Sequence, residues 1–432
     1  MKGCPTVLAR RPTISPKLTL FLVLFVVSVG FGLIIPILPL LTRAYGASPF
    51  ELGAMTASYS VVQFLFAPIW GQISDRVGRK PILMLGITGL SLSFLFMGFA
   101  ESFAGLFWAR VLGGLLASAT LPAAQALAAD QSGNQDRAQV MGLMGAAFGI
   151  GFIVGPVLGG ALAPFGMNMP FFAGAILGAL TVVLAGVVLR EGHRTASEAP
   201  RAAMETGVSG ATAKSAVEGR GVLWRNIGQA LRGPGEAYYV LAFVIMFTQS
   251  CLMTALAYFF TDRFGSSAAT IGVIFALNGA CGALIQGSAI GPLTARLGER
   301  KVILVGLGIG AIAFTALVIA PTLFLAVGSV LLMAVSMSLT RPSASSALSK
   351  VTQLPQGITM GVQSSFDSLG RVIGPLWAGY AYELSHGAPF LSAAVVGLVA
   401  LFYIRARTVD IGTDSGSGPE TGEKRLARPG RA

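Results

Sequence analysis

The chain has 432 residues, of which 54% are hydrophobic and only 11% are charged, and its net charge is +12. The mean hydropathy of +0.74 is far above that of soluble globular proteins. The composition therefore excludes a soluble globular protein and predicts an integral membrane protein.

Twelve apolar runs are each long enough to cross the ~30 Å hydrocarbon core as a helix of about 20 residues. They lie at 18–41, 51–73, 81–100, 104–129, 138–163, 168–189, 237–260, 269–293, 302–322, 323–348, 357–383 and 388–405. No small-residue cleavage site follows the first run, so we expect it to be a span and not a cleaved signal peptide. The sequence thus predicts an all-α integral membrane fold with twelve transmembrane helices.

The Lys and Arg residues indicate which helix ends face the cytoplasm. With the N-terminus inside, only Arg43 and Arg263 of the 30 basic residues fall in outer loops, while Arg110, Arg341 and Arg371 lie within spans. This asymmetry follows the positive-inside rule and places both termini in the cytoplasm. Topology explains the positive charge, so we expect no nucleic-acid partner.

A polar segment divides the spans into six and six. Residues 190–236 are rich in Gly, Ala, Ser and charged residues, which is typical of a flexible linker, here cytoplasmic. It separates an N-terminal six-helix bundle at 18–189 from a C-terminal one at 237–405. The ends at 1–17 and 406–432 are expected to be cytoplasmic tails, the second of them disordered.

The two bundles repeat each other in sequence, which predicts pseudo-symmetry. A shift of 219 residues relates identical residues of the two halves: Gly53 and Gly272, Gly142 and Gly361, Gly155 and Gly374, Pro156 and Pro375, and Gly160 and Gly379. A shift of 220 relates Gly71 to Gly291 and Gly78 to Gly298. Parallel repeats of this kind are one way in which transporters build alternating access.

Four motifs resemble those of the major facilitator superfamily. They are GFGLIIPILPLL (30–41), GQISDRVGRK (71–80), ARVLGGLLAS (109–118) and GIGFIVGPVLGG (149–160). Together they resemble the twelve-helix drug:proton antiporter branch and its tetracycline and multidrug exporters. The resemblance implies a secondary transporter of a bacterial inner membrane that exports amphipathic organic compounds by alternating access, driven by protons and using no cofactor.

Charged residues at inner helix ends are candidates for a cytoplasmic gate. Asp75 and Arg79 are four residues apart and can pair at the membrane surface. The resemblance implies that this cluster, with Asp130, holds the inner faces of the halves together. A shift of 220 places Glu299 and Lys350 on Arg79 and Asp130 with the signs exchanged, so they are either a second pair or two unrelated surface charges. The complete set of gate candidates is Gly71, Asp75, Arg76, Gly78, Arg79, Asp130, Glu299 and Lys350.

Small residues in the fifth span predict a close helix crossing. Gly151, Gly155, Gly159 and Gly160 leave room for a neighbouring helix, and Pro156 bends the axis. We expect that neighbour to be the eighth span, which also carries glycines.

Ionisable side chains at membrane depth are candidates for proton coupling. Asp367 and Arg371 lie one turn apart near the midplane, where they form either a structural ion pair or a proton site. The family counterpart of Arg110 is implicated in coupling. Related exporters carry an acid in the first span, where this chain has Val26–Val29, so Asp367 is the leading acid and Asp75 and Asp130 are the fallbacks.

Polar side chains on several spans are candidates for the substrate cavity. They are Gln63, Gln125, Gln249, Tyr258, Asn278 and Arg341, although Arg341 could instead reach toward the inner surface. No metal-binding or catalytic motif occurs, so we expect no metal and no enzyme. We expect a monomer in the lipid bilayer. The alternatives are a proton symporter or facilitator for a small metabolite and, from another class, a non-transporting membrane sensor.

Overall fold

The computed structural model describes residues 16–131, 137–189, 228–352 and 354–407, and all regular structure in these ranges is helical. The first half contains α1 (Pro16–Ala44), α2 (Pro49–Val77), α3 (Arg79–Gly98), α4 (Phe103–Ala117), α5 (Thr120–Gln131), α6 (Arg137–Leu162), η1 (Ala163–Phe165) and α7 (Met169–Val188). The second half contains α10 (Glu236–Phe264), α11 (Ala268–Ser288), α12 (Ile290–Leu297), α13 (Glu299–Ile319), α14 (Leu323–Val351), α15 (Gln356–Leu384) and α16 (Ala388–Arg407). Most of the expected linker and nearly all of both expected tails lie outside the described residues.

Eleven candidate spans in the described ranges are long and apolar enough to cross a membrane. α15 is not among them, although its 29 residues extend for roughly 43 Å at 1.5 Å per residue. Its polar residues, including Asp367 and Arg371, lower its hydropathy. With α15 counted, the arrangement is consistent with the twelve predicted helices.

The fourth predicted span is not one continuous helix. It breaks at Ser118 and Ala119 into α4 and α5. Pro122 explains the break, because it has no N–H to donate to the carbonyl of Ser118 and its ring would clash with that carbonyl. The corresponding Pro342 lies inside the continuous helix α14, so this break is not shared by the two halves.

Local signals at the helix ends repeat between the halves. Ser48 caps α2 and Ser267 caps α11, each accepting a hydrogen bond from a backbone N–H of the first turn. At the inner ends, Gly78 and Gly298 adopt φ angles of +114° and +78°, in the region that favours glycine. Because the caps recur at a shift of 219 and the glycines at a shift of 220, the repeat governs where the helices begin and turn.

The two halves meet closely at the side opposite the basic helix ends, which we call the outer side. There α2 packs along α15, and α6 packs along α11. A Cβ added to Gly53 would lie 2.2 Å from the carbonyl oxygen of Pro375, and one added to Gly272 would lie 2.3 Å from that of Pro156. The shift of 219 converts each contact into the other, so the same backbone crossing is made twice around a pseudo-twofold axis.

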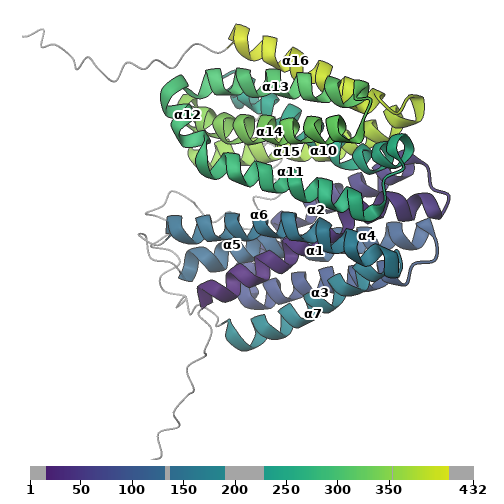
Figure 1. The fold of residues 1–432 in the computed structure, drawn as a ribbon. Helices are drawn as coiled ribbons and strands as arrows, with labels where there is room; N and C mark the ends of the chain where they lie inside the picture. Colours follow the sequence, from purple (N-terminus) through teal and green to yellow (C-terminus); the bar gives the residue numbers. More distant parts are fainter. Residues whose placement is uncertain (1–15, 132–136, 190–227, 353, 408–432) are drawn as a thin grey trace, which may run out of the picture.

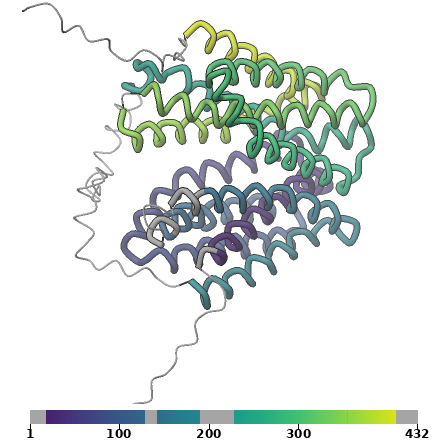
Figure 2. Tube along the Cα trace, turned by 60° about the vertical axis from the view of Figure 1, so that its left-hand side comes forward, coloured from purple at the N-terminus to yellow at the C-terminus, as the bar shows by residue number. Residues whose placement is uncertain are grey.

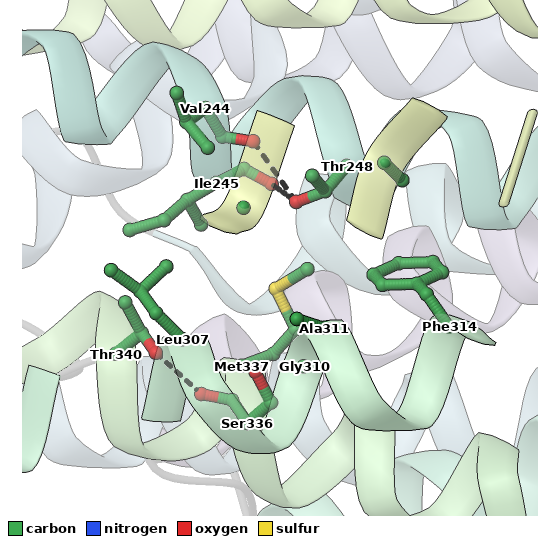
Figure 3. Close-up of a pocket in the computed structure, with 12 residues that line it drawn as sticks. Val244, Ile245, Thr248, Leu307, Gly310, Ala311, Phe314, Ser336, Met337 and Thr340 are labelled. Atoms are coloured by element: carbon green, nitrogen blue, oxygen red, sulfur yellow. Dashed lines mark hydrogen bonds between the residues drawn. The ribbon is translucent and has the colours of Figure 1, made fainter. Parts of the chain in front are cut away.

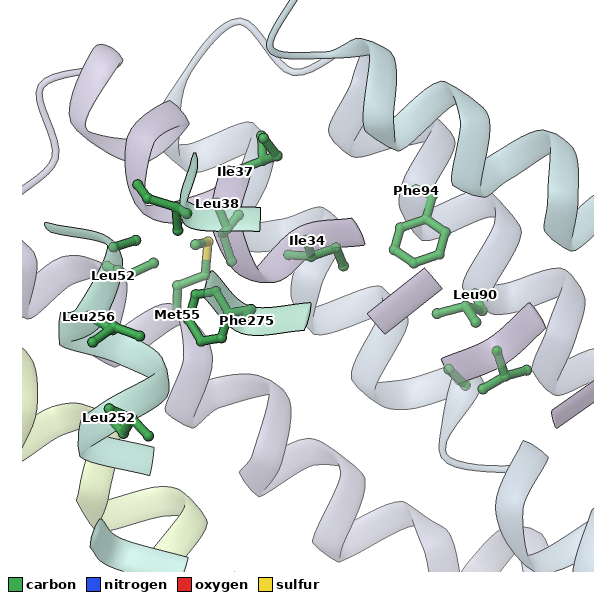
Figure 4. Close-up of a cluster of buried hydrophobic side chains, with 14 of the residues drawn as sticks. Ile34, Ile37, Leu38, Leu52, Met55, Leu90, Phe94, Leu252, Leu256 and Phe275 are labelled. Atoms are coloured by element: carbon green, nitrogen blue, oxygen red, sulfur yellow. The ribbon is translucent and has the colours of Figure 1, made fainter. Parts of the chain in front are cut away.

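A second pair of symmetric contacts extends this closure. A Cβ on Gly379 would lie 2.3 Å from the carbonyl oxygen of Pro49, and one on Gly160 would lie 2.8 Å from that of Ala268. Leu52 and Met55 of α2 belong to one buried apolar cluster with Leu252 and Leu256 of α10, as Figure 4 shows. Close backbone contact and buried apolar side chains therefore seal the outer side.

The inner side is open between the halves. Added Cβ atoms would meet nothing within 4 Å at Gly71 of α2, Gly142 of α6, Gly291 of α12 and Gly361 of α15. Figure 1 shows the first half (purple to blue) and the second half (green to yellow) touching at the right and separated at the left, and Figure 2 agrees. The halves are therefore in contact at the outer side and apart at the inner side, which the charge bias assigns to the cytoplasm. This arrangement is inward-open, and we call the space between the halves the cleft.

The glycines of α6 pack mainly on α1, contrary to our expectation of the eighth span. A Cβ on Gly151 would meet Ser28 at 2.5 Å, and one on Gly155 would meet Gly32 at 2.6 Å. Gly159 faces the carbonyl of Leu33 in the same way, while Gly160 alone of the four faces α11, which is the eighth span. The face of α6 that carries Gly151, Gly155 and Gly159 thus supports its own half, and only its outer end takes part in the closure.

We predict that Gly53→Ala destabilises the protein by about 1–3 kcal/mol, because the new methyl group collides with backbone that cannot rotate away. Gly272→Ala should act in the same direction. Thermal unfolding in detergent measures the effect. The matched control is Gly361→Ala, which adds a methyl group in open space on a helix and should leave the midpoint unchanged or raise it. Equal midpoints for Gly53→Ala and Gly361→Ala would show that the crossing is not tight.

Candidate functional site

Charged residues from three helices lie at membrane depth along the cleft. Arg371 lies near the middle of α15, and Asp367 lies one turn closer to the inner side. Arg341 on α14 and Arg110 on α4 are the other two. These four side chains, together with Tyr59 of α2, form what we call the central site.

Asp367 pairs with Arg341 of the neighbouring helix, contrary to the ion pair with Arg371 that the spacing allows. The distance from Arg341 Nη2 to Asp367 Oδ2 is 3.9 Å, and the Asp367 side chain is only 14% exposed. Among the described residues, Arg371 forms no ion pair within 4 Å. Arg371 is exposed, and it lies one turn inward of Pro375, whose backbone meets Gly53 of the first half, so it faces the cleft.

Arg110 is buried against an aromatic ring of the same half. Its guanidinium carbon lies 4.6 Å from the centroid of the Tyr59 ring, which is a cation–π distance. Gly113 and Gly114, one turn further along α4, allow α2 to approach closely enough for this contact. Within the described part of the chain, the Arg110 Nε and the Tyr59 hydroxyl have no hydrogen-bond partner although both are buried.

The central site contains residues of both halves. Gly53 of α2 meets the backbone of Pro375 of α15. Tyr59 lies six residues inward of this crossing on α2, and Arg371 lies four residues inward of it on α15, in the opposite half. The sequence marks Arg110 and Arg371 by their depth in the membrane, whereas the contact of Arg110 with Tyr59 follows only from the fold.

The other candidates for the substrate cavity differ in their exposure and contacts. Gln63 and Gln249 are half-buried and Gln125 is exposed, so all three remain accessible. The Asn278 side chain donates from Nδ2 to the carbonyl oxygen of Val330 at 3.0 Å, which ties α11 to α14. Tyr258 is 1% exposed and lies in the outer closure, so its place in a substrate cavity stays a prediction.

Both predicted inner ion pairs form, each within its own half. Asp75 Oδ1 lies 2.9 Å from Arg79 Nη1 in the first half. In the second half Glu299 pairs with Lys350, and Ser346 Oγ lies 3.2 Å from the same carboxylate oxygen of Glu299. Both pairs line the open inner side, while the Asp130 side chain lies outside the described residues. Arg76 is exposed, and Gly71 and Gly78 lie at the inner end of α2.

An outer ionic closure is the main feature that sequence analysis missed. Arg43 at the end of α1 forms a bidentate pair with Asp262 at the end of α10, and the Tyr382 hydroxyl of α15 donates to the same carboxylate at 2.8 Å. The Tyr258 hydroxyl shares a 3.1 Å hydrogen bond with Thr42 beside this pair. Arg43 and Asp262 are 219 residues apart, so they are repeat counterparts with opposite charge that meet near the pseudo-twofold axis.

The small cavity in Figure 3 is not part of the central site. It has a volume of ≈ 20 Å³ and is enclosed by α10, α13, α14 and α16 of the second half. The hydroxyls of Thr248 and Thr340 at its wall donate to backbone carbonyls of their own helices. Since the polar groups at its wall are satisfied and the space holds about one water, it is a packing defect.

We predict that reversing either charge of the outer closure shifts the protein toward the conformation that is closed on the inner side. Arg43→Asp or Asp262→Arg places like charges at the axis, which should change the ratio of the two conformations roughly fivefold or more. Spin labels at Val77→Cys and Leu297→Cys, both on exposed positions at the inner side, report the opening by pulsed electron paramagnetic resonance. The single variants should shorten the inner distance, and the double reversal should restore it. A double variant that behaves as the sum of the singles would contradict the pairing.

Comparison with known proteins agrees with the fold. A family model described as Major Facilitator Superfamily matches residues 20–234 and 238–429. "Multidrug resistance protein 2" of Bacillus subtilis (strain 168) is 30% identical over 400 residues, covering 90% of this chain and 96% of that protein. "Tetracycline resistance protein, class G" of Vibrio anguillarum is 31% identical over 388 residues, covering 88% and 94%.

A solved structure supports the fold. The crystal structure of a bacterial homologue of the human lysosomal transporter Spinster, in an inward-facing and occupied conformation, superposes with a TM-score of 0.72 at 17% identity and covers 90% of this chain and 96% of that chain. At this identity the similarity concerns the fold alone. Since the family model covers nearly the whole chain and two relatives reach 30% identity, the chain is a multi-pass membrane protein and belongs to the Major Facilitator Superfamily.

Proposed function

We propose that this protein exports amphipathic organic compounds from the cytoplasm in exchange for protons, with Asp367 as the acid that carries the coupling proton. The relatives whose names refer to multidrug and tetracycline resistance support export of such compounds. The observation that carries the proposal is the position of Asp367, a carboxyl group at membrane depth beside two arginines in a cleft open to one side.

The local geometry suits a group that gains and loses a proton. Asp367 is largely buried, and its distance of 3.9 Å from Arg341 leaves the pair loose. Burial favours the neutral carboxylic acid, whereas nearby arginines favour the carboxylate. A change of conformation that moves either arginine would alter this balance, and coupling requires such a change.

Alternating access supplies the second part of the proposed mechanism. With the outer closure formed, the substrate and the proton site exchange with the cytoplasm. When the outer closure opens, the inner ends must approach, and we propose that the Asp75–Arg79 and Glu299–Lys350 pairs then hold the inner gate together. Each proton that enters down a membrane potential of about 100 mV provides about 2.3 kcal/mol to drive the cycle.

The proposal also includes the oligomeric state, the membrane and the energy source. The transporter works as a monomer in the lipid of a bacterial-type inner membrane and uses no cofactor, since the proton gradient provides the energy. A panel of compounds tested in a strain that lacks its own efflux pumps, with and without a protonophore, identifies substrates and the direction of transport. Accumulation inside the cells instead of exclusion would favour a symporter.

We predict that Asp367→Asn abolishes proton-driven uphill transport in proteoliposomes, with a loss of about tenfold or more, while substrate binding and downhill exchange remain. The amide keeps nearly the same shape but cannot cycle its charge. Arg341, the partner that loses its counter-charge, is 58% exposed and stays solvated, so the variant should fold. Binding in the same preparation confirms this.

Arg341→Gln is the matched control, because it breaks the same ion pair but leaves the acid. If Asp367 carries the proton, Arg341→Gln retains uphill transport with a changed pH profile. Uphill transport by Asp367→Asn at the rate of the original protein would assign the proton to another acid, with Asp75 and Asp130 next to be tested.

A further inference from the structure

We infer that the central site selects organic anions: amphipathic molecules with an apolar body and a negative group, held between Arg371 of the second half and Arg110 of the first. The inference rests on the proposed function, since it names the substrate class of the same cleft.

The inference begins with the charges at membrane depth. Three arginines and one carboxylate lie at this depth among the described residues, and that carboxylate, Asp367, is paired with Arg341. All other described Asp and Glu residues lie in loops or within three residues of a helix end: Glu51, Asp75, Glu101, Asp130, Glu236, Asp262, Glu299 and Glu383. Three arginines and one acid therefore leave an excess of two positive charges among the residues that the structure describes at this depth.

Arg110 presents an unsatisfied buried group. Arg110 is 9% exposed, and neither its Nε nor the adjacent Tyr59 hydroxyl has a hydrogen-bond partner in the described ranges. Buried polar groups, and charged groups above all, are normally hydrogen-bonded because leaving them unpaired costs free energy. A negative group that reached these two atoms would accept hydrogen bonds from Arg110 and Tyr59, and a cationic ligand would not.

Arg371 completes the site from the opposite half. It is exposed, and it lies one turn inward of Pro375, whose backbone meets Gly53 of the first half. Low-dielectric walls on both sides focus the field of Arg371 and Arg110 into the cleft, where they attract anions. A ligand between the halves would thus contact Arg371 directly and would have the largely buried Arg110 on its other side.

The same arrangement disfavours cations and leaves room for an apolar body. A cation would compete with Arg341 for Asp367 and would be repelled by Arg371 and Arg110, so selection works by repulsion as well as attraction. Phe31 meets the edge of the Tyr59 ring at 5.9 Å, and Phe366 precedes Asp367 and stacks on Tyr239 at 6.0 Å. These rings provide an apolar surface next to the charges, which an organic anion can cover and an inorganic one cannot.

The test uses three dyes with one xanthene scaffold: fluorescein, which is anionic near neutral pH, rhodamine 110, which has no net charge, and rhodamine 123, which is cationic. Binding to the full chain in nanodiscs of zwitterionic lipid is measured by fluorescence polarisation, with empty nanodiscs as the blank. We expect fluorescein to bind at least about tenfold more tightly than rhodamine 123, with rhodamine 110 between them. Equal affinities, or tighter binding of rhodamine 123, would overturn the inference.

Variants then assign the selectivity to the site. Arg371→Gln should weaken fluorescein binding about tenfold without weakening rhodamine 123 binding, whereas Arg371→Lys should keep the preference. Arg296→Gln, which removes an exposed charge on α12, is the matched control and should change neither dye. If Arg371→Gln weakens both dyes equally, the site does not select by charge. If the Gln variant does not fold, the Lys variant and the three dyes decide.

Two further measurements distinguish the selection of organic anions from the binding of inorganic anions and from proton coupling. Phosphate at the concentration of fluorescein should not displace the dye, and full displacement would mean that the site binds inorganic anions, contrary to the inference. Transport of the same dyes under a pH gradient is measured in proteoliposomes. Selective binding of fluorescein without proton-driven export would refute the proposed function and leave the substrate class standing.

Discussion

The close approach of two helix pairs at the outer side is the constraint on which the rest of the structure depends. Gly53 meets the backbone at Pro375, and its repeat counterpart Gly272 meets the backbone at Pro156. Because interior packing in lipid gains little from the hydrophobic effect, such contact between small residues is a main source of helix association. Crossing α2 over α15 and α6 over α11 at one end leaves their other ends apart, and the inner cleft follows from this geometry.

Near the pseudo-twofold axis, counterpart residues of the two repeats lie next to each other. At one such position the counterparts carry opposite charges. Arg43 and Asp262 occupy equivalent positions in the two repeats and pair directly. Identical charges at these positions would repel, so divergence of the repeats was required for the ionic closure. The pair joins the two halves at the outer side. Because it is partly exposed, breaking it costs little free energy.

Away from the axis the repeats have diverged in function. Asp367 and Arg371 lie on α15, whereas the equivalent positions of α6 are Phe148 and Phe152. One half thus provides the titratable acid, and the other provides Arg110 and Tyr59 through α4 and α2. In the proposed mechanism, the symmetric part of the molecule allows the conformational change, and the asymmetric part provides the coupling acid and the arginines.

The helices, the repeat and the charged turns could all be predicted from the amino-acid sequence, because helix length, capping and a shift of residue numbers are local properties. The exchanged signs in the repeat also offered Glu299–Lys350 as a pair or as two unrelated surface charges, and the structure shows the pair. The pairing of Asp367 with Arg341, the place of Tyr258 in the outer closure and the packing of α6 on α1 emerged only from the folded structure. These contacts escape prediction because the lipid-facing and buried surfaces of a membrane helix are equally apolar. Periodicity therefore does not reveal how each helix is rotated, and that rotation selects the partner of every polar side chain.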